Sequence, residues 1–244
     1  MKNFVSALGF LTIIPTPADS FREDGRQILY FPVIGLLIGA MLWAVDTLGA
    51  RAYGEIRIVL DVLFLAVISG ALHLDGLADS VDGLFAHRSR ERALEIMKDP
   101  RIGTMGTLAV IFCILLKLAG LKGLTGTGHE YWLLAVPACA RTGQVAGLVS
   151  TPYARSEGGK SMVFFQKGHY GLLVFGVVPL ALFFSSGVSA GIAAFGTFLI
   201  ITVLSLWFFR NKIGGVTGDT LGALTELLET TLFIVGGIVC TNFN

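Results

Sequence analysis

The chain has 244 residues, of which 54% are hydrophobic and 14% are charged, and its formal net charge is +1. Soluble domains carry roughly 25% charged residues, so this composition excludes an ordinary soluble protein and indicates an integral membrane protein. The basic residues lack the interleaved aromatic residues typical of nucleic-acid binding, so no nucleic-acid partner is expected.

Continuous apolar runs recur along the chain, and a membrane-spanning helix needs about 20 such residues. A transmembrane barrel would show short alternating segments instead. The predicted fold is all-α, a polytopic helical bundle that forms a single membrane domain over residues 1–244 and has the lipid bilayer as its surroundings. We expect about seven membrane helices, at 31–50, 56–72, 102–121, 131–150, 171–187, 188–208 and 219–239.

The Lys and Arg residues are divided unevenly between the two ends of the predicted bundle. Most of the 18 lie in the N-terminal segment and in the loops at 73–101, 151–170 and 209–218. The opposite loops contain Arg51, Arg57 and Lys122. Because cytoplasmic loops are enriched in Lys and Arg, we expect the N-terminus and the first group of loops in the cytoplasm, the C-terminus outside, and the chain in the inner, cytoplasmic membrane.

One densely charged stretch interrupts the apolar sequence, since residues 73–83 read HLDGLADSVDG. The second predicted span runs into it without a proline or a turn cluster, so we expect one helix to continue through Asp75. On that helix Asp75, Asp79 and Asp82 share one face. Carboxylates so close repel one another unless a cation lies between them, and oxygen-only ligation favours Mg²⁺. We predict a Mg²⁺ site at these aspartates, with His73 or Asp82 as the catalytic proton acceptor.

A second polar segment, residues 98–106, is suited to bind phosphate. A proline turn and two glycines bring Lys98 and Arg101 to the start of the third span, beside Gly103. The N–H groups and the dipole of a helix N-terminus also favour an anion. We therefore predict that these residues contact a substrate phosphate.

A third segment, residues 214–219, reads GGVTGD and precedes the last span. Its glycines allow the backbone to wrap an anion, and Thr217, Gly218 and Asp219 lie where the helix begins. Asp219 either caps that helix or adds to the metal site. We predict that these three residues also bind substrate.

Charged residues also occur inside predicted spans. Arg141 and Gln144 lie near the middle of the fourth span, and a buried guanidinium costs a few kcal/mol unless it has a partner or water. Glu226 and Glu229 of the last span are candidate partners for Arg141. The sequence leaves open whether these groups pair structurally or line a cavity.

All the glycine-rich and acidic motifs fall on one predicted face of the membrane, which indicates a single site that opens to the cytoplasm. A metal held by aspartates, with cations and helix N-termini for phosphates, is typical of phosphoryl transfer from a nucleotide-activated donor to an alcohol. The segment Asp79-x-x-Asp82-Gly83-x-x-Ala86 resembles the opening of the CDP-alcohol phosphotransferase signature, although His87 stands where that signature has an arginine.

The whole sequence resembles the cobalamin synthase family, the adenosylcobinamide-GDP ribazoletransferases. The resemblance is carried by FLTIIPTP at 10–17, HLDGLADSVDG at 73–83, IMKDPRIGTMG at 96–106 and GGVTGDTLGA at 214–223. It implies a Mg²⁺-dependent membrane enzyme that joins adenosylcobinamide-GDP to α-ribazole, or its 5′-phosphate, and releases GMP. It also implies that Asp75, Asp79 and Asp82 bind Mg²⁺. The same resemblance implies that Lys98, Arg101, Thr217 and Asp219 are site residues.

Two alternatives remain at this stage. An ion-coupled membrane transporter would use Arg141, Glu226 and Glu229 as a pathway near the membrane midplane. Another Mg²⁺-dependent membrane phosphotransferase would share the aspartate chemistry and differ in its substrates. The sequence does not decide whether the chain forms a homo-oligomer.

Overall fold

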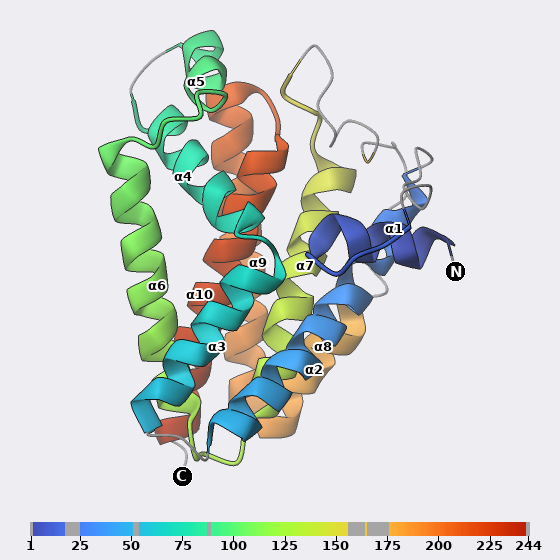
Figure 1. The fold of residues 1–244 in the computed structure, drawn as a ribbon, viewed down its shortest axis with the longest axis vertical. Helices are drawn as coiled ribbons and strands as arrows, with labels where there is room; N and C mark the ends of the chain where they lie inside the picture. The colour runs from blue at the N-terminus through green and yellow to red at the C-terminus, as the bar shows by residue number, and fades with distance from the viewer. Residues whose placement is uncertain are drawn as a thin grey trace.

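The computed structural model describes residues 2–17, 25–50, 54–86, 89–155, 164 and 176–242, and these residues form a bundle of helices (Figure 1). The predicted all-α fold is confirmed. In chain order the helices are α1 (Lys2–Leu11), η2 (Arg26–Tyr30), α2 (Phe31–Gly49), α3 (Gly54–Ile68), α4 (Leu72–Leu84), α5 (Arg90–Ile96), α6 (Thr104–Leu124), α7 (Tyr131–Ser150), α8 (Val177–Leu182), η5 (Phe183–Ser186), α9 (Val188–Ile213) and α10 (Gly218–Asn242).

Helices α7 and α10 form the centre of the bundle. α10 packs against α4, α6, α7 and α9, while α2 packs along α7. In the apolar 18-residue stretch of each helix, 83% of the α7 residues are buried, compared with only 22% of the α9 residues. Small residues allow the close packing, because a side chain on Gly39 of α2 would clash with the carbonyl oxygen of Leu134 in α7.

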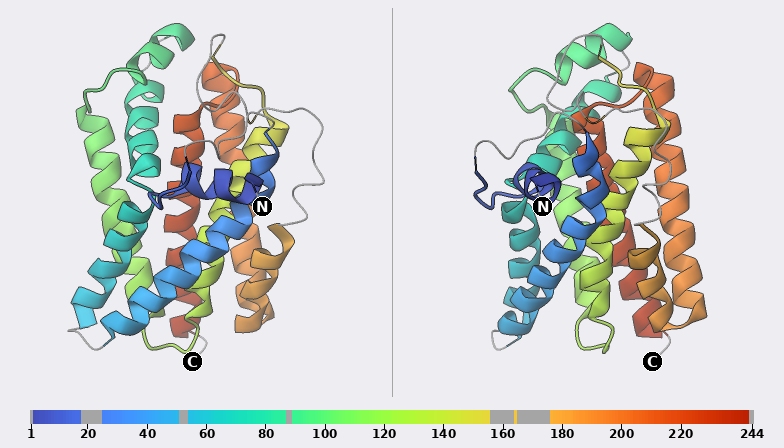
Figure 2. Two further views of the ribbon diagram at one scale, coloured as in Figure 1. Left: turned by 45° about the vertical axis from the view of Figure 1, so that its right-hand side comes forward. Right: turned by 90° about the vertical axis from the view of Figure 1, so that its right-hand side faces the viewer.

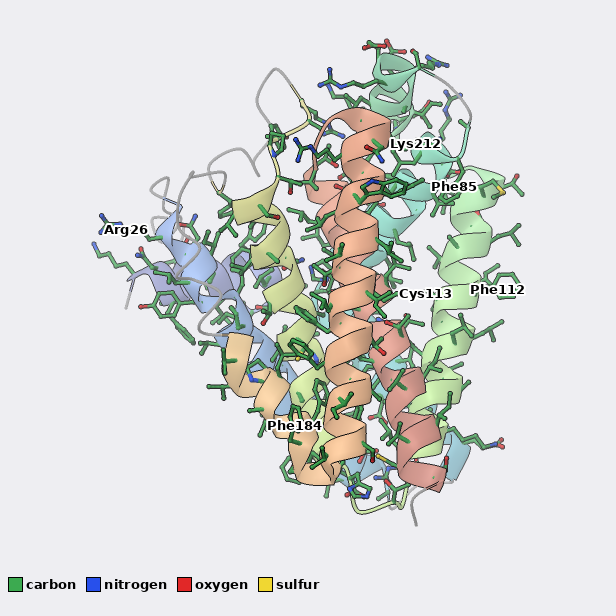
Figure 3. All side chains as sticks on the ribbon, turned by 180° about the vertical axis from the view of Figure 1, so that it is seen from behind. Arg26, Phe85, Phe112, Cys113, Phe184 and Lys212 are labelled. Carbon is green, nitrogen blue, oxygen red and sulfur yellow. The ribbon has the colours of Figure 1, made fainter. Side chains whose placement is uncertain are left out.

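The outer helices present large apolar side chains to their surroundings. On α9, Ile200, Leu204 and Trp207 are each more than half exposed. On α6, Phe112 projects away from the bundle whereas its neighbour Cys113 points inward (Figure 3). An apolar surface of this extent is unfavourable in water and favourable in lipid, so the fold is that of a multi-pass membrane protein.

Five segments are long and apolar enough to cross a bilayer: Arg26–Gly49, α6, α7, α9 and α10. A sixth crossing results if α3 and α4 together count as one bent span. The expectation of about seven spans is not confirmed. The span expected at 171–187 corresponds to the short apolar helix Val177–Ser186, while residues 171–175 lie outside the described part of the chain.

The prediction that the second span continues unbroken through Asp75 is wrong. α3 ends at Ile68, α4 starts at Leu72, and the two helices are bent by 83°. Gly70 and Ala71 both have a positive φ, 59° and 57°, which reverses the handedness of the backbone and ends the helix. The N–H of Ile13 donates to the carbonyl oxygen of Ile68, 2.8 Å away, and so satisfies a group that the break leaves without a helical partner.

The polar connections gather at one end of the bundle. The connections α4–α5–α6 and α9–α10 and the end of α7 lie together at the top of Figure 1, and the C-terminus lies at the opposite end. Figure 2 shows the same separation in two further views, with α1 lying across the side of the bundle. The three segments predicted to form the site therefore meet at one end of the molecule.

Candidate active site

The start of α10 is fixed by a pair of threonines. The hydroxyl of Thr217 accepts a hydrogen bond from the Thr220 N–H at 3.2 Å, and the Thr220 hydroxyl accepts one from the Thr217 N–H at 2.8 Å. Thr217 is completely buried. Thr217 is therefore the N-cap of α10, which leaves the Asp219 carboxylate free of the capping role considered for it.

A short pairing of two distant segments lies beside this helix start. The Ala154 N–H donates to the Val216 carbonyl at 2.9 Å, and the Val216 N–H donates to the Pro152 carbonyl at 3.0 Å. A side chain on Gly215 would clash with the Pro152 carbonyl oxygen, so glycine is required there. Arg90 of α5 reinforces the junction, because its guanidinium donates to the carbonyls of Ile213 and Ala154 at 2.7 and 2.8 Å.

This pairing brings Arg155 to Asp219. Arg155 Nη2 donates to Asp219 Oδ2 at 2.8 Å, and the Thr217 hydroxyl donates to the same oxygen at 3.3 Å. Both side chains of the ion pair keep some exposure, 17% for Arg155 and 27% for Asp219. The sequence predictions missed Arg155, because nothing in the pattern links positions 64 residues apart. Its position just before the glycine-rich residues 156–160, which lie outside the described residues, was the only available hint.

The carboxylates of α4 face this pair across a close helix contact. A Cβ added to Gly76 would lie 2.7 Å from the backbone oxygen of Asp219, so only glycine allows α4 and α10 to approach this closely. Asp79 lies within electrostatic range of Asp75, Asp82 and Asp219, and of the cation Arg155. We call Asp75, Asp79, Asp82 and Asp219 the carboxylate cluster. The predicted i, i+4, i+7 helical spacing of the first three is confirmed, since all lie on α4.

Within the cluster, Asp82 makes contacts that the others do not. Its two carboxylate oxygens accept the N–H groups of Gly103 and Gly106 at 2.7 and 2.8 Å, at the start of α6. A carboxylate at a helix N-terminus is stabilised by the helix dipole. We expected a substrate phosphate at the start of α6 beside Gly103. The Asp82 carboxylate occupies that position instead.

The predicted cations of the 98–106 segment lie on the surface. Lys98 is exposed and lines a cavity of about 390 Å³ together with Arg90 and Arg155. The Arg101 guanidinium donates to both oxygens of Asp99, at 2.9 and 2.6 Å, and these bonds lower the pKa of Asp99 to about 2. The structure therefore brings Lys98 near Arg155, whereas Arg101 pairs with its own neighbour.

A second cavity, of about 170 Å³, opens beside the carboxylate cluster. Three phenylalanines form part of its wall, with ring centroids 4.6 Å apart for Phe10 and Phe164 and 5.8 Å apart for Phe31 and Phe164. We call it the phenylalanine cavity; its lining residues are Phe10, Phe31, Leu72, His73, Asp75, Gln144, Leu148, Phe164, Gly218, Asp219 and Leu221.

His73 is buried in the wall of this cavity between two side chains of α7. Its Nδ1 lies 3.5 Å from the Arg141 guanidinium, and its Nε2 lies 3.1 Å from the Gln144 amide. The Gln144 atom at that distance is the amide nitrogen, which can only donate, so Nε2 of a neutral imidazole accepts its hydrogen bond. His73 thereby positions the Gln144 amide at the cavity.

Behind His73 lies a set of completely buried charges that we call the buried charge network: Lys117, Arg141, Glu226 and Glu229. Lys117 Nζ lies 2.7 Å from Glu226 and 2.6 Å from Glu229, and Arg141 pairs with Glu229. Two cations balance two anions, so the network is neutral, while Arg141 Nε has no hydrogen-bond partner among the described residues. The open question about Arg141 is thereby answered in favour of structural pairing, and the sequence predictions had not included Lys117.

The carboxylate cluster suits Mg²⁺ by the chemistry of its donors. It offers carboxylate oxygens alone, the ligands that Mg²⁺ prefers, with the local excess of negative charge that a cation would relieve. Among the described residues, no three His, Cys, Asp or Glu side chains lie close enough together to hold a metal ion by themselves. Mg²⁺ is usually held by one or two carboxylates together with waters and substrate phosphates, so these residues fit a metal that arrives with its substrate.

Comparisons with known proteins agree on one family. The family model described as cobalamin-5-phosphate synthase matches residues 3–237. Proteins named adenosylcobinamide-GDP ribazoletransferase are similar over nearly their whole length. The one from Alkaliphilus metalliredigens is 40% identical, covering 94% of this chain and 92% of its own, and the one from Chlorobaculum parvum is 38% identical, covering 98% and 96%. No solved structure matches this chain.

Proposed function

The chain belongs to the cobalamin-5-phosphate synthase family, and we propose that its carboxylate cluster and Arg155 form the active site of an adenosylcobinamide-GDP ribazoletransferase. This transferase activity completes the assembly of cobalamin, and it belongs to the family as a whole. In this chain we assign the residues that carry out the transfer, the metal that they bind and the side of the membrane on which they lie.

The observation that carries the proposal is the close contact of α4 and α10 at Gly76, which gathers the carboxylates of both helices around one cation, Arg155. We propose that Asp79 and Asp219 hold Mg²⁺ with the diphosphate of the donor. The metal would neutralise charge on the diphosphate and on the departing phosphate. Asp82 fixes α6 against α4, and Thr217 caps α10, so both act by positioning the others.

The transfer itself balances without a further reactant. A hydroxyl oxygen of the acceptor bonds to the phosphorus on the cobinamide side of the diphosphate, and the bond from that phosphorus to the bridging oxygen breaks. GMP leaves with the electron pair of that bond, and the Arg155 guanidinium would stabilise the charge on the departing phosphate. The hydroxyl proton would pass to Asp75, the carboxylate of the cluster that neither holds the metal nor fixes α6.

We further propose that the site faces the cytoplasm, where a soluble nucleotide-activated donor is available. The cluster lies at the end of the bundle that carries Arg90, Lys98 and Arg155, and cytoplasmic ends are enriched in Lys and Arg. A reporter fused at the loop before α5 should give a cytoplasmic signal, and one fused at the C-terminus an external signal. The reverse pattern would place the site outside and refute this orientation.

The activity test uses membranes that contain the protein, incubated with adenosylcobinamide-GDP, α-ribazole and Mg²⁺, with GMP and the complete corrinoid as readouts. Asp79→Asn and Asp219→Asn should each lower turnover by about a hundredfold or more, because even groups that only support a metal ligand contribute about 10- to 100-fold. A chelator should stop the wild type, and added Mg²⁺ should restore it.

The matched control is Glu55→Gln, which removes a carboxylate at the opposite end of the bundle, where Glu55 is exposed and 3.7 Å from Lys122. It should leave turnover unchanged. Full activity in Asp79→Asn and Asp219→Asn would show that the carboxylate cluster is not the site, even though the chain belongs to the family.

A further inference from the structure

We propose that the phenylalanine cavity binds the aromatic base of the acceptor nucleoside, so that α-ribazole is held between α1, α2, α7 and α10 while its sugar reaches the carboxylate cluster. The inference rests on the proposed function, because it takes the cluster as the place of the reaction. It adds a binding site for the second substrate and names the side chains that form it.

The first support is the shape and lining of the cavity. Its volume of about 170 Å³ is smaller than the roughly 300 Å³ of pockets that hold an entire drug-sized ligand, so it accommodates one ring system. Phe10, Phe31 and Phe164 contact one another and present aromatic surface to it. Stacking on such rings is the usual way in which proteins hold a nucleoside base.

The second support is a buried polar group without a partner. The amide nitrogen of Gln144 contacts His73, and its amide oxygen, an acceptor, has no hydrogen-bond partner within the described parts of the chain. Gln144 is 5% exposed and lines the cavity. A buried polar atom left unpaired is destabilising, so a ligand group that donates a hydrogen bond to the Gln144 oxygen would remove this cost.

The phenylalanine cavity and the larger cavity beside Arg155 differ in the charged residues of their linings, and this difference indicates which substrate each one binds. The described lining of the phenylalanine cavity contains two carboxylates, Asp75 and Asp219, and no Lys or Arg. That lining offers no cation to pair with a phosphate and is otherwise largely apolar, so it suits a neutral base. The larger cavity contains three cations, Arg90, Lys98 and Arg155, as well as the carboxylates of Glu91 and Glu95, and its cations can pair with phosphates. Asp219 lines the phenylalanine cavity and pairs with Arg155, which lines the larger cavity. The acceptor hydroxyl and the donor diphosphate would therefore meet between the two cavities.

This arrangement also identifies which carboxylates are close to the reacting hydroxyl. Asp75 and Asp219 border the phenylalanine cavity, whereas Asp79 and Asp82 do not line it. A base in the cavity places its attached sugar beside these two side chains. They are therefore the members of the cluster in reach of the hydroxyl proton.

The test measures KM for each substrate separately, with the other substrate saturating. Phe10→Leu removes one aromatic ring and keeps an apolar side chain, so KM for α-ribazole should rise about three- to tenfold. Leu148→Phe adds volume inside the cavity and should raise the same KM about tenfold or more. KM for adenosylcobinamide-GDP should change by less than about twofold in both variants.

The matched control is Phe4→Leu, the same substitution on the same helix at a ring that contacts Tyr30 and does not line the cavity. It should leave both KM values unchanged. The proposal is overturned if Phe4→Leu and Phe10→Leu raise KM for α-ribazole equally, or if Leu148→Phe leaves it unchanged. It is also overturned if KM for the donor rises as much as KM for the acceptor, because the cavity would then not distinguish them.

These outcomes are separable from a failure of the proposed function. If Asp79→Asn remained active while Phe10→Leu selectively raised KM for α-ribazole, the acceptor site would stand and the metal site would lie elsewhere. If Asp79→Asn were inactive and neither cavity variant changed KM for α-ribazole, the reaction centre would stand and the acceptor site would be refuted. If Leu148→Phe failed to fold, Phe10→Leu and its control would still decide the question.

Discussion

Two groups of charged side chains lie along α10, and they differ in balance and in exposure. At the start of the helix, Asp219 belongs to a cluster with Asp75 and Asp79 and pairs with Arg155, all at or near the surface. Further along, Glu226 and Glu229 pair with Lys117 and Arg141, and every member of that network is at least 95% buried. The buried charge network is neutral, whereas the carboxylate cluster carries an excess of negative charge.

The difference shows how charge is used in this membrane protein. A buried ion pair needs its full complement of partners, because an uncompensated charge in a low-dielectric interior is very costly. An excess of like charge is sustainable only near water or with an external cation. Balanced, buried charge therefore lies where the helices pack together, and unbalanced, partly exposed charge lies in the part of the molecule that we propose binds a ligand.

The largest effect should come from unbalancing the buried network. Glu229→Gln leaves Lys117 and Arg141 with one fewer anion, and breaking a buried pair in this way costs about 3–5 kcal/mol. We expect a strongly lowered melting temperature of the purified protein in nanodiscs. A melting temperature equal to that of the wild type would mean that the network is not what stabilises the contact of α6, α7 and α10.

The contact between α4 and α10 should be the next most sensitive. Gly76→Ala places a methyl group 2.7 Å from the Asp219 backbone oxygen, and overpacking of this kind costs about 1–3 kcal/mol. Because the substitution separates the two halves of the carboxylate cluster, turnover should fall along with stability. Ala78→Gly, on the same helix but without an added methyl group, is the comparison; a larger loss of turnover there than in Gly76→Ala would contradict this account.

A change at the cation of the cluster should affect turnover more than folding. Arg155→Gln removes the partner of Asp219 at a site that is partly exposed, so we expect a melting temperature close to that of the wild type. Turnover should fall about tenfold or more, because a charge that stabilises a departing phosphate is lost. Measured GMP release that is unchanged in Arg155→Gln would remove Arg155 from the proposed mechanism.

The smallest effect is expected where a charge is both paired and exposed. Arg92 Nη1 and Glu95 Oε2 lie 2.9 Å apart on α5, with both side chains more than 60% exposed. Pairs of this kind contribute under about 0.5 kcal/mol, so Glu95→Gln should leave the melting temperature within about 2 °C of the wild type. A clear destabilisation would show that exposure is not the property that separates the two groups of charges.

Much of the fold was predictable from residue patterns, because apolar runs and carboxylate spacing are local. The placement of Asp75, Asp79 and Asp82 on one helix required no knowledge of distant residues. The break before α4 was missed, since Ser69, Gly70 and Ala71 contain no proline and two of them adopt a positive φ that only the surrounding structure sustains.

The parts of the candidate site that were missed depend on contacts between distant segments. Arg155 reaches Asp219 through the pairing of residues 152–154 with 216. Asp82 reaches Gly103 and Gly106, which follow it in the chain only after helix α5. A threonine just before a helix can cap that helix or bind a ligand, and the sequence does not distinguish the two roles. The hydrogen bonds between Thr217 and Thr220 show that Thr217 caps α10.

The most direct test of the central claim is whether the carboxylate cluster binds a divalent cation, measured with Mn²⁺ as the probe by electron paramagnetic resonance on the purified protein with adenosylcobinamide-GDP present. The account predicts that Asp79→Asn and Asp219→Asn each weaken Mn²⁺ binding by about tenfold or more, while Glu55→Gln binds Mn²⁺ as the wild type does. Equal Mn²⁺ binding in all four proteins would contradict it.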